Sequence, residues 1–123
     1  MIAACLLAGT VILARIPGET FTLRWLHSVE RTAWEEDYEV HPDHLELVGS
    51  RVRGSGAGME PEEGGHWRDG AWQSDRRERF EELALTRSPY AQDYEWCRGG
   101  TCRALEHWLG AATEVQFIRV KPC

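Results

Sequence analysis

Turn-forming pairs of residues interrupt this sequence repeatedly, and their spacing is the feature that most restricts its fold. Pro17-Gly18, Pro42-Asp43, Asp69-Gly70 and Gly99-Gly100 each separate two segments that contain apolar, aromatic or β-branched residues. Asp-Gly and Gly-Gly are typical of the two-residue turns that join neighbouring antiparallel strands. Short segments separated by such turns indicate an antiparallel all-β domain.

Alternation of side-chain type supports strands between these turns. Residues 21–26 alternate between apolar and polar, which is close to the pattern of a half-buried strand. Residues 34–40 alternate again, with apolar or aromatic side chains at the even-numbered positions Trp34, Tyr38 and Val40. Glu36 also has an even number but is acidic, so it is a local misfit in this pattern. The apolar parity shifts once more between Leu47 and Val52, and this shift predicts a β-bulge.

The remaining segments complete an all-β expectation. We expect strands at residues 83–86 and 115–120, one helical turn at residues 105–109, and a first strand or short hairpin within residues 1–13. The length fits a single domain, residues 1–123, which can bury a core without a metal ion. The predicted fold is an antiparallel β-sandwich or an open barrel of short strands, with at most one short helix.

Charge and hydropathy disfavour two classes of partner. The chain has 20 acidic and 14 basic residues and a net charge of −6, which disfavours nucleic acid and anionic membrane surfaces. No apolar run approaches the roughly 20 residues that span a bilayer, so we expect no membrane span in this chain. The first 13 residues lack a basic region, and Gly9-Thr10 interrupts their apolar run. We therefore expect any export signal to lie outside this chain.

The spacing of two cysteines predicts a cross-strand pair. The chain has four cysteines, Cys5, Cys97, Cys102 and Cys123. A two-residue turn at Gly99-Gly100 would place Cys97 opposite Cys102 with Cα atoms about 4.5–5.5 Å apart, a distance that a disulfide accepts. The alternatives are free thiols in a reducing compartment and half of a zinc site completed elsewhere in the chain.

Functional side chains are densest on two segments that we expect to form neighbouring strands. The candidate binding residues there are His27, Ser28, Glu30, Trp34, Glu35 and Glu36. Carboxylates suit a hard cation, and the set could equally hold a polar ligand. A Ser-His-acid hydrolase is the weakest alternative, because His27 and Ser28 point to opposite faces of a strand. In a purely structural interpretation, His27 and Glu30 satisfy backbone groups in a turn and the other acids line a solvated face.

A glycine-rich segment is the second candidate region. Residues 49–65 hold six of the twelve glycines, and the candidate binding residues in this segment are Gly54, Ser55, Gly56, Gly58 and Met59. The segment is not a phosphate-binding loop, because its glycines lead into Met59-Glu60-Pro61 instead of Gly-Lys-Ser/Thr. We expect a tight loop beside the strand that carries His27. His41, His44, His66 and His107 are expected to be surface or turn residues.

Several of these stretches together resemble the bacterial family known as domain of unknown function 1850 (DUF1850). The matching stretches are residues 21–32, 34–38, 51–61, 69–72 and 93–105, with Arg31 where lysine is commoner. His-Ser-Val-Glu and Gly-Ser-Gly-Ala-Gly-Met are specific in combination. The resemblance implies an accessory protein of solute uptake, encoded beside TRAP-type transporters of the TAXI group and acting outside the cytoplasm or at the membrane face.

The first functional hypothesis is therefore a non-enzymatic accessory or interaction domain of such a transporter. Its partners would be a solute-binding protein or permease, and its recognition surface would include His27, Glu35 and residues 54–59. The alternative is a small-ligand or cation-binding domain that uses His27, Glu35 and Glu36. We expect no cofactor and assign no residue as the ligand of a resident metal ion.

Overall fold

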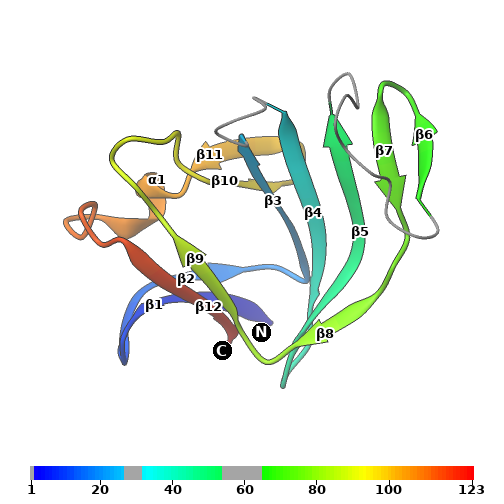
Figure 1. Ribbon diagram of the computed structural model, residues 1–123. Coiled ribbons are helices and arrows are strands. Elements are labelled where there is room, and N and C mark those ends of the chain that lie inside the picture. Colours follow the sequence, from blue (N-terminus) through cyan, green and yellow to red (C-terminus); the bar gives the residue numbers. More distant parts are fainter. Residues whose placement is uncertain (1, 27–31, 54–64) are drawn as a thin grey trace.

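The computed structural model describes residues 2–26, 32–53 and 65–123, which form two antiparallel sheets packed face to face (Figure 1). The smaller sheet has the order β2-β1-β12-β9. Its strands are β1 (Ala3–Ala8), β2 (Val11–Pro17), β9 (Leu83–Thr86) and β12 (Phe117–Pro122). The predicted antiparallel all-β fold is confirmed, and its two sheets form a sandwich that does not close into a barrel.

The larger sheet has the order β11-β10-β3-β4-β5-β7-β6. Its central strands are β3 (Thr20–Leu26), β4 (Ala33–Val40) and β5 (Leu45–Arg53). The outer strands are β6 (His66–Arg68), β7 (Ala71–Ser74), β10 (Glu95–Arg98) and β11 (Thr101–Ala104). Strand β8 (Glu78–Phe80) pairs with the first part of β5 and leads the chain into β9 of the other sheet.

The predicted hairpin turns form at the predicted residues. Asp69 and Gly70 join β6 to β7 with φ of 53° and 76°, and Gly99 and Gly100 join β10 to β11 with φ of 57° and 81°. Positive φ at both central residues is the signature of a type I′ turn, whose twist matches that of the flanking strands. The first segment is also a hairpin, since β1 pairs with β2.

The predicted bulge lies in β5. Asp37 of β4 pairs with Gly49, whereas the next residue, Tyr38, pairs with Leu47, so Val48 is an extra residue. One extra residue reverses the alternation of the strand. The bulge therefore explains why Leu47, at an odd-numbered position, and Val52, at an even-numbered position, both belong to the apolar pattern of β5.

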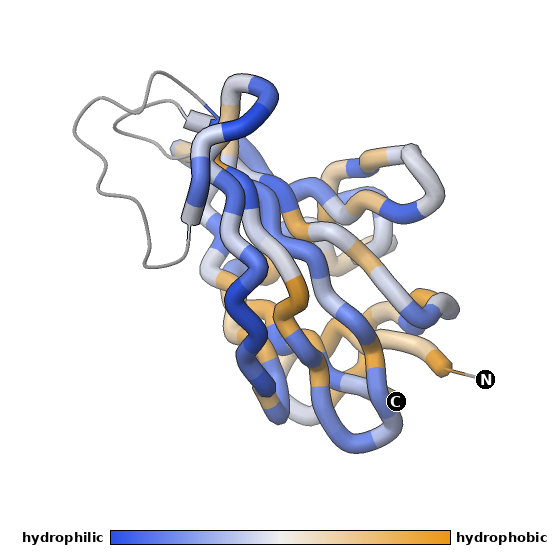
Figure 2. Tube along the Cα trace, turned by 90° about the vertical axis from the view of Figure 1, so that its right-hand side faces the viewer, coloured by the Kyte–Doolittle hydropathy of each residue, from blue (hydrophilic) through white to orange (hydrophobic). Residues whose placement is uncertain are grey.

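The core lies between the sheets and is built from the inward side chains of both. Along the strands, hydrophobic and hydrophilic residues alternate (Figure 2). Trp96 is 1% exposed and its ring stacks on Phe21 at 4.0 Å between centroids, and Phe21 in turn stacks on Tyr38. The predicted helical turn forms as the short helix α1 (Glu106–Leu109), which buries Leu109. The strand expected from residue 115 begins at Phe117.

Two disulfides hold the fold. Cys97 and Cys102 pair across the β10–β11 hairpin with Cα atoms 4.0 Å apart. Cys5 and Cys123 join β1 to the end of the chain, and the Cys123 amide also donates to the carbonyl oxygen of Ala3. Among the described residues, no helix is long and apolar enough to cross a membrane.

Candidate functional site

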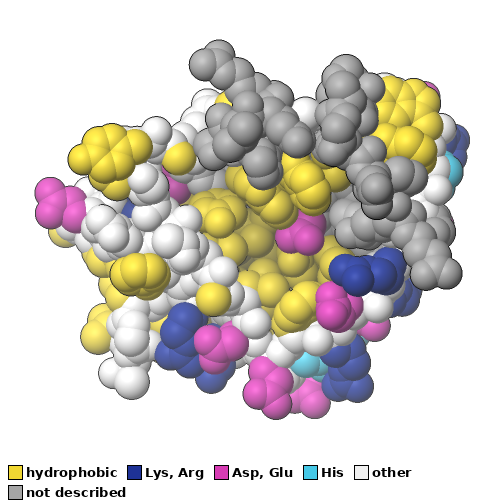
Figure 3. Space-filling view, viewed as in Figure 1, with side chains coloured by type: hydrophobic (Ala, Val, Ile, Leu, Met, Phe, Trp, Pro, Cys, Tyr) yellow, Lys and Arg dark blue, Asp and Glu magenta, His cyan; other side chains and the backbone are white. Residues whose placement is uncertain are grey.

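A cleft opens between β9 and the inner faces of β3 and β4, and we call it the Glu36 cleft. Its volume is about 310 Å³. It is lined by Leu23, Trp25, Glu36, Tyr38, Phe80, Glu82, Leu83, Ala84, Leu85 and Tyr94. Figure 3 shows hydrophobic side chains gathered in the hollow at the middle of this face, with an acidic group among them.

Aromatic rings form two walls of the cleft. Trp25 and Tyr94 pack with ring centroids 5.8 Å apart, and Tyr38 and Phe80 meet edge to face at 6.3 Å. Glu36 is the acidic residue that interrupts the apolar parity of β4. Its Oε1 atom accepts a hydrogen bond from the Tyr38 hydroxyl at 2.9 Å. The sequence misfit is therefore a carboxylate on the inner, aromatic side of the larger sheet.

The two tyrosines of the cleft are held in their neutral forms. Burial raises the pKa of Tyr38 well above its ordinary value, and the charge and hydrogen bond of Glu36 raise it further. Burial also raises the pKa of Tyr94, although a hydrogen bond from the backbone of Thr86 opposes this shift. Both phenols therefore keep their protons at physiological pH, and the Tyr38 hydroxyl donates a hydrogen bond to Glu36.

Glu35 lies on the opposite face of the larger sheet. Its Oε1 atom accepts hydrogen bonds from Arg53 Nε at 2.7 Å and from Arg51 Nε at 3.3 Å. Adjacent residues of a strand point to opposite faces. The sequence prediction grouped Glu35 with Glu36, but the sheet separates them. Trp34, the third described candidate, stacks on Trp25 with centroids 6.2 Å apart.

The remaining sequence candidates fall in the two gaps of the structure. His27, Ser28, Glu30, Gly54, Ser55, Gly56, Gly58 and Met59 lie outside the described residues.

Asp37 lies on the same outer face of the larger sheet as Glu35 and forms a hydrogen-bond network with Arg51 and Thr22. It accepts hydrogen bonds from Arg51 Nη1 at 2.6 Å, Arg51 Nη2 at 2.8 Å and Thr22 Oγ1 at 2.6 Å. Burial alone would raise the pKa of Asp37, but the hydrogen bonds from Arg51 and Thr22 and the charge of Arg51 outweigh it. The pKa of Asp37 is therefore lowered, and folding favours its ionised form.

This shift predicts a pH-dependent contribution to stability. Because the folded-state pKa is depressed, the contribution is complete above the unfolded-state pKa of about 3.9 and disappears as the pH falls through the folded-state value. We expect Asp37→Asn to lower the free energy of unfolding by about 1–2 kcal/mol at pH 7. The deficit should shrink toward zero on acidification, as measured by urea denaturation from pH 7 to pH 2.

Asp75→Asn is the matched control for this prediction, because Asp75 is exposed and outside the network. It should leave the stability curve unchanged at every pH. A deficit of Asp37→Asn that stays constant as the pH falls would contradict the assignment of the shift to Asp37.

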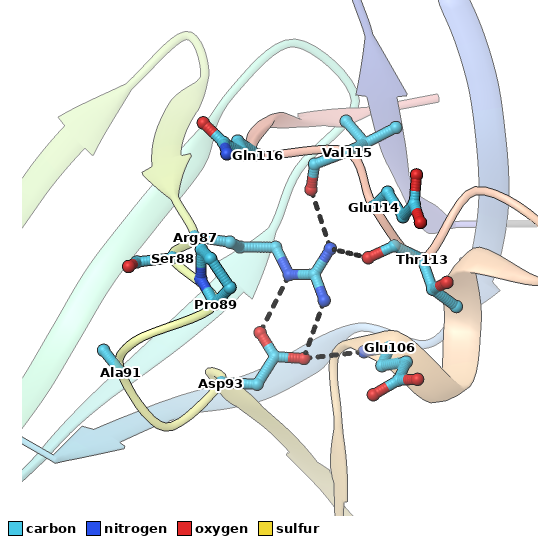
Figure 4. A pocket seen from close by; sticks show the side chains of 10 residues that line it. All are labelled: Arg87, Ser88, Pro89, Ala91, Asp93, Glu106, Thr113, Glu114, Val115 and Gln116. Atoms are coloured by element: carbon cyan, nitrogen blue, oxygen red, sulfur yellow. Dashed lines mark hydrogen bonds and ion pairs between the residues drawn. The ribbon is translucent and has the colours of Figure 1, made fainter.

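A larger hollow of about 660 Å³ surrounds Arg87. The Arg87 guanidinium forms hydrogen bonds with other groups of the protein (Figure 4). The Arg87 guanidinium donates to both carboxylate oxygens of Asp93, at 2.9 and 3.2 Å. Its Nη1 atom also donates to the carbonyl oxygens of Thr113 and Val115, at 3.0 and 2.7 Å. Four hydrogen bonds with protein acceptors indicate a structural role for this guanidinium.

Asp93 connects the Arg87 side chain to Tyr94, a residue of the Glu36 cleft. Its carboxylate accepts hydrogen bonds from the backbone amides of Tyr94 and Glu106, both at 2.9 Å. Tyr94 is one of the aromatic walls of the cleft, so the Arg87–Asp93 pair helps to fix that wall. Sequence reasoning missed this pair, because no local pattern links Arg87 to the carbonyl groups that precede β12.

Comparison with known proteins places the chain in a family. No curated protein and no solved structure is similar enough to this chain to match it. One family model, described as a domain of unknown function, matches residues 21–105. The matched region covers more than half of the chain, extends from β3 through β11, and includes Glu36 and the aromatic residues of the cleft. The protein therefore belongs to the DUF1850 family.

Proposed function

We propose that this domain is a binding protein for a small organic cation, a molecule with an apolar body and a protonated amine, and that the Glu36 cleft is its site. The observation that carries the proposal is a carboxylate set among aromatic rings at the centre of an open cleft. The proposal refines the expected cation-binding role, because it uses Glu36 and assigns Glu35 to the structure of the opposite face.

The chemistry of the cleft matches such a ligand. Aromatic faces attract cations through their quadrupoles, and they also provide apolar contact area. Glu36 would supply the counter-charge for an ammonium group. A carboxylate can accept several hydrogen bonds at once, so its bond to Tyr38 is compatible with a bond to a ligand. The Tyr38 hydroxyl would then hold the carboxylate in place.

The second acidic residue of the cleft has a different role. Both carboxylate oxygens of Glu82 accept hydrogen bonds from Arg119, at 2.7 and 2.8 Å. Arg119 therefore holds Glu82 at the edge of the cleft, whereas Glu36 lies beside the aromatic rings, and we assign ligand recognition to Glu36 because of these surroundings. The cleft volume of about 310 Å³ is at the lower end of the range for ligand sites, which suits a molecule of about ten heavy atoms.

Phenethylamine is a suitable probe, with 2-phenylethanol as its uncharged counterpart. We expect phenethylamine to bind and to shift the indole N–H signal of Trp25 in a ¹⁵N–¹H spectrum. Glu36→Gln should weaken binding by about 10–100-fold, which corresponds to the loss of a hydrogen bond to a charged group. Isothermal titration calorimetry measures this change.

Glu35→Gln is the matched control, because it removes the same charge from the adjacent residue on the opposite face of the sheet. It should leave the affinity for phenethylamine unchanged. Equal binding of phenethylamine and 2-phenylethanol would contradict charge recognition. Equal losses in the two variants would show that the overall charge of β4, and not the Glu36 cleft, controls binding.

The role beside a TRAP-type transporter stays a prediction from the family resemblance. It is compatible with a binding function, since an accessory protein could recognise the charged group of a transported solute. The described surfaces do not favour a particular transporter component. Co-purification with the solute-binding protein or the permease, compared between the wild type and Glu36→Gln, would test whether the cleft takes part.

A further inference from the structure

We propose a second site on this protein, a binding site for a divalent transition-metal ion formed by Glu39, His41 and Glu46. The site lies where β4 turns into β5, on the outer side of the larger sheet. It is independent of the Glu36 cleft, and its ligand is an inorganic ion instead of an organic one.

The strand register brings the two carboxylates together. Glu39 of β4 lies directly opposite Glu46 of β5, and His41 follows the end of β4. One potential ligand atom from each of the three residues lies within 4.8 Å of the other two. Like charges at directly opposed positions of antiparallel strands are destabilising. A cation between Glu39 and Glu46 would remove this repulsion.

The turn orients the imidazole of His41 toward the two carboxylates. The His41 amide donates to the carbonyl oxygen of His44 at 2.9 Å, which closes the turn. The two imidazole rings stack at 4.5 Å between centroids, with their planes 6° apart. His41 Nε2 lies 3.2 Å from Glu39 Oε1. The ligand nitrogen is therefore positioned by backbone and ring contacts that do not require a metal ion.

The donor set selects the class of metal. Magnesium and calcium prefer sites built from oxygen alone, whereas imidazole nitrogen combined with carboxylates suits zinc, manganese or ferrous iron. Three protein ligands would leave at least one coordination position for water, as in zinc sites that have three protein ligands. All four cysteines are in disulfides, so thiols do not compete for zinc.

Arg77 provides the counter-charge in the absence of a metal ion. Its Nη1 atom lies 3.0 Å from Glu46 Oε2 and 4.0 Å from Glu39 Oε1. The Arg77 side chain is 60% exposed, and exposed ion pairs contribute little to stability. A metal ion can therefore displace this guanidinium at small cost. It follows that Arg77 competes with the metal, and that its removal should strengthen metal binding.

Calorimetric titration of the untagged, oxidised protein with ZnCl₂ tests the proposal. We expect one zinc ion per chain and no binding of MgCl₂. His41→Ala should weaken zinc binding by at least about tenfold, since even the loss of an outer partner of a metal ligand costs 10–100-fold. Arg77→Ala should bind zinc more tightly than the wild type. His107→Ala is the control, because His107 is exposed and distant in sequence, and it should bind zinc like the wild type.

The combination of variants separates a built site from adventitious binding. The loss of zinc affinity in His41→Ala supports the site only if the circular dichroism spectrum of this variant matches that of the wild type. If the spectra differ, the zinc affinity of Arg77→Ala alone tests the site, because that variant retains all three ligands. Unchanged zinc affinity in Arg77→Ala, equal losses in the two histidine variants, or binding of magnesium as tight as that of zinc would overturn the proposal. Binding of phenethylamine should not respond to Arg77→Ala, so failure at one site is distinguishable from failure at the other.

Discussion

Removal of the Cys5–Cys123 disulfide is expected to lower the free energy of unfolding by about 5 kcal/mol. The bond joins residues that are 118 positions apart. In the chain-entropy model, a cross-link that closes a loop of about this length restricts the unfolded chain by nearly 5 kcal/mol. That value is comparable to the total stability of many domains. We therefore expect the double variant Cys5→Ala/Cys123→Ala to be partly or wholly unfolded at 37 °C.

Urea denaturation followed by circular dichroism measures this loss. The double variant Cys97→Ala/Cys102→Ala is the matched control, because it removes a disulfide that closes a loop of only five positions. The same model gives about 2 kcal/mol for that bond. If the two double variants lost equal stability, loop closure would not be the main contribution of the terminal disulfide.

The second large effect is expected at the Arg87–Asp93 pair. Asp93→Ala should lower the free energy of unfolding by about 3–4 kcal/mol, because it leaves a largely buried guanidinium without its counter-charge. The side chains of Arg87 and Asp93 are only 11% and 19% exposed. The substitution also removes the acceptor of the Tyr94 and Glu106 amides. Thermal and urea denaturation check the loss.

Glu82→Ala is the control for this prediction. Glu82 and Arg119 form a pair with two similar hydrogen bonds, but both side chains are 36% exposed. Exposed ion pairs contribute little, so this variant should lose much less stability than Asp93→Ala. Comparable losses would mean that the geometry of the pair, and not its burial, sets its contribution.

Asp93→Ala also links the structural pair to the proposed function. Because Asp93 holds the Tyr94 amide, its loss should loosen one aromatic wall of the Glu36 cleft. At a temperature where the variant is folded, we expect weaker phenethylamine binding than in the wild type. The effect should be smaller than that of Glu36→Gln, because the carboxylate that recognises the cation is still present.

Local sequence chemistry was sufficient for several features of the fold. The turns at Asp69-Gly70 and Gly99-Gly100 were predictable because few residue pairs tolerate positive φ at both positions. The parity shift between Leu47 and Val52 was enough to predict the bulge. Glu36 was identifiable as an acidic residue in the apolar parity of its strand, although the pattern could not show what surrounds it.

Other features of the candidate sites depend on contacts between distant segments. The Glu36 cleft requires β9, whose residues 83–86 lie far along the chain from those of β3 and β4. The Arg87–Asp93 pair is completed by carbonyl groups of Thr113 and Val115. The sequence predicted neither arrangement. The sequence prediction also grouped Glu35 with Glu36 because they are adjacent, although the alternation of a strand already places adjacent residues on opposite faces.

The sequence by itself determined where two of the hairpins turn, where most of the strands lie, and which one of them carries an acidic residue on its apolar side; it did not predict β8 or the full length of β2. These are properties of single residues and short periods, which backbone sterics and side-chain burial fix locally. Only the tertiary structure decided which strands meet across the sandwich, that Cys5 joins Cys123, and that Glu39, His41 and Glu46 converge. Those outcomes depend on the pairing and packing of segments far apart in the chain, which no local pattern encodes.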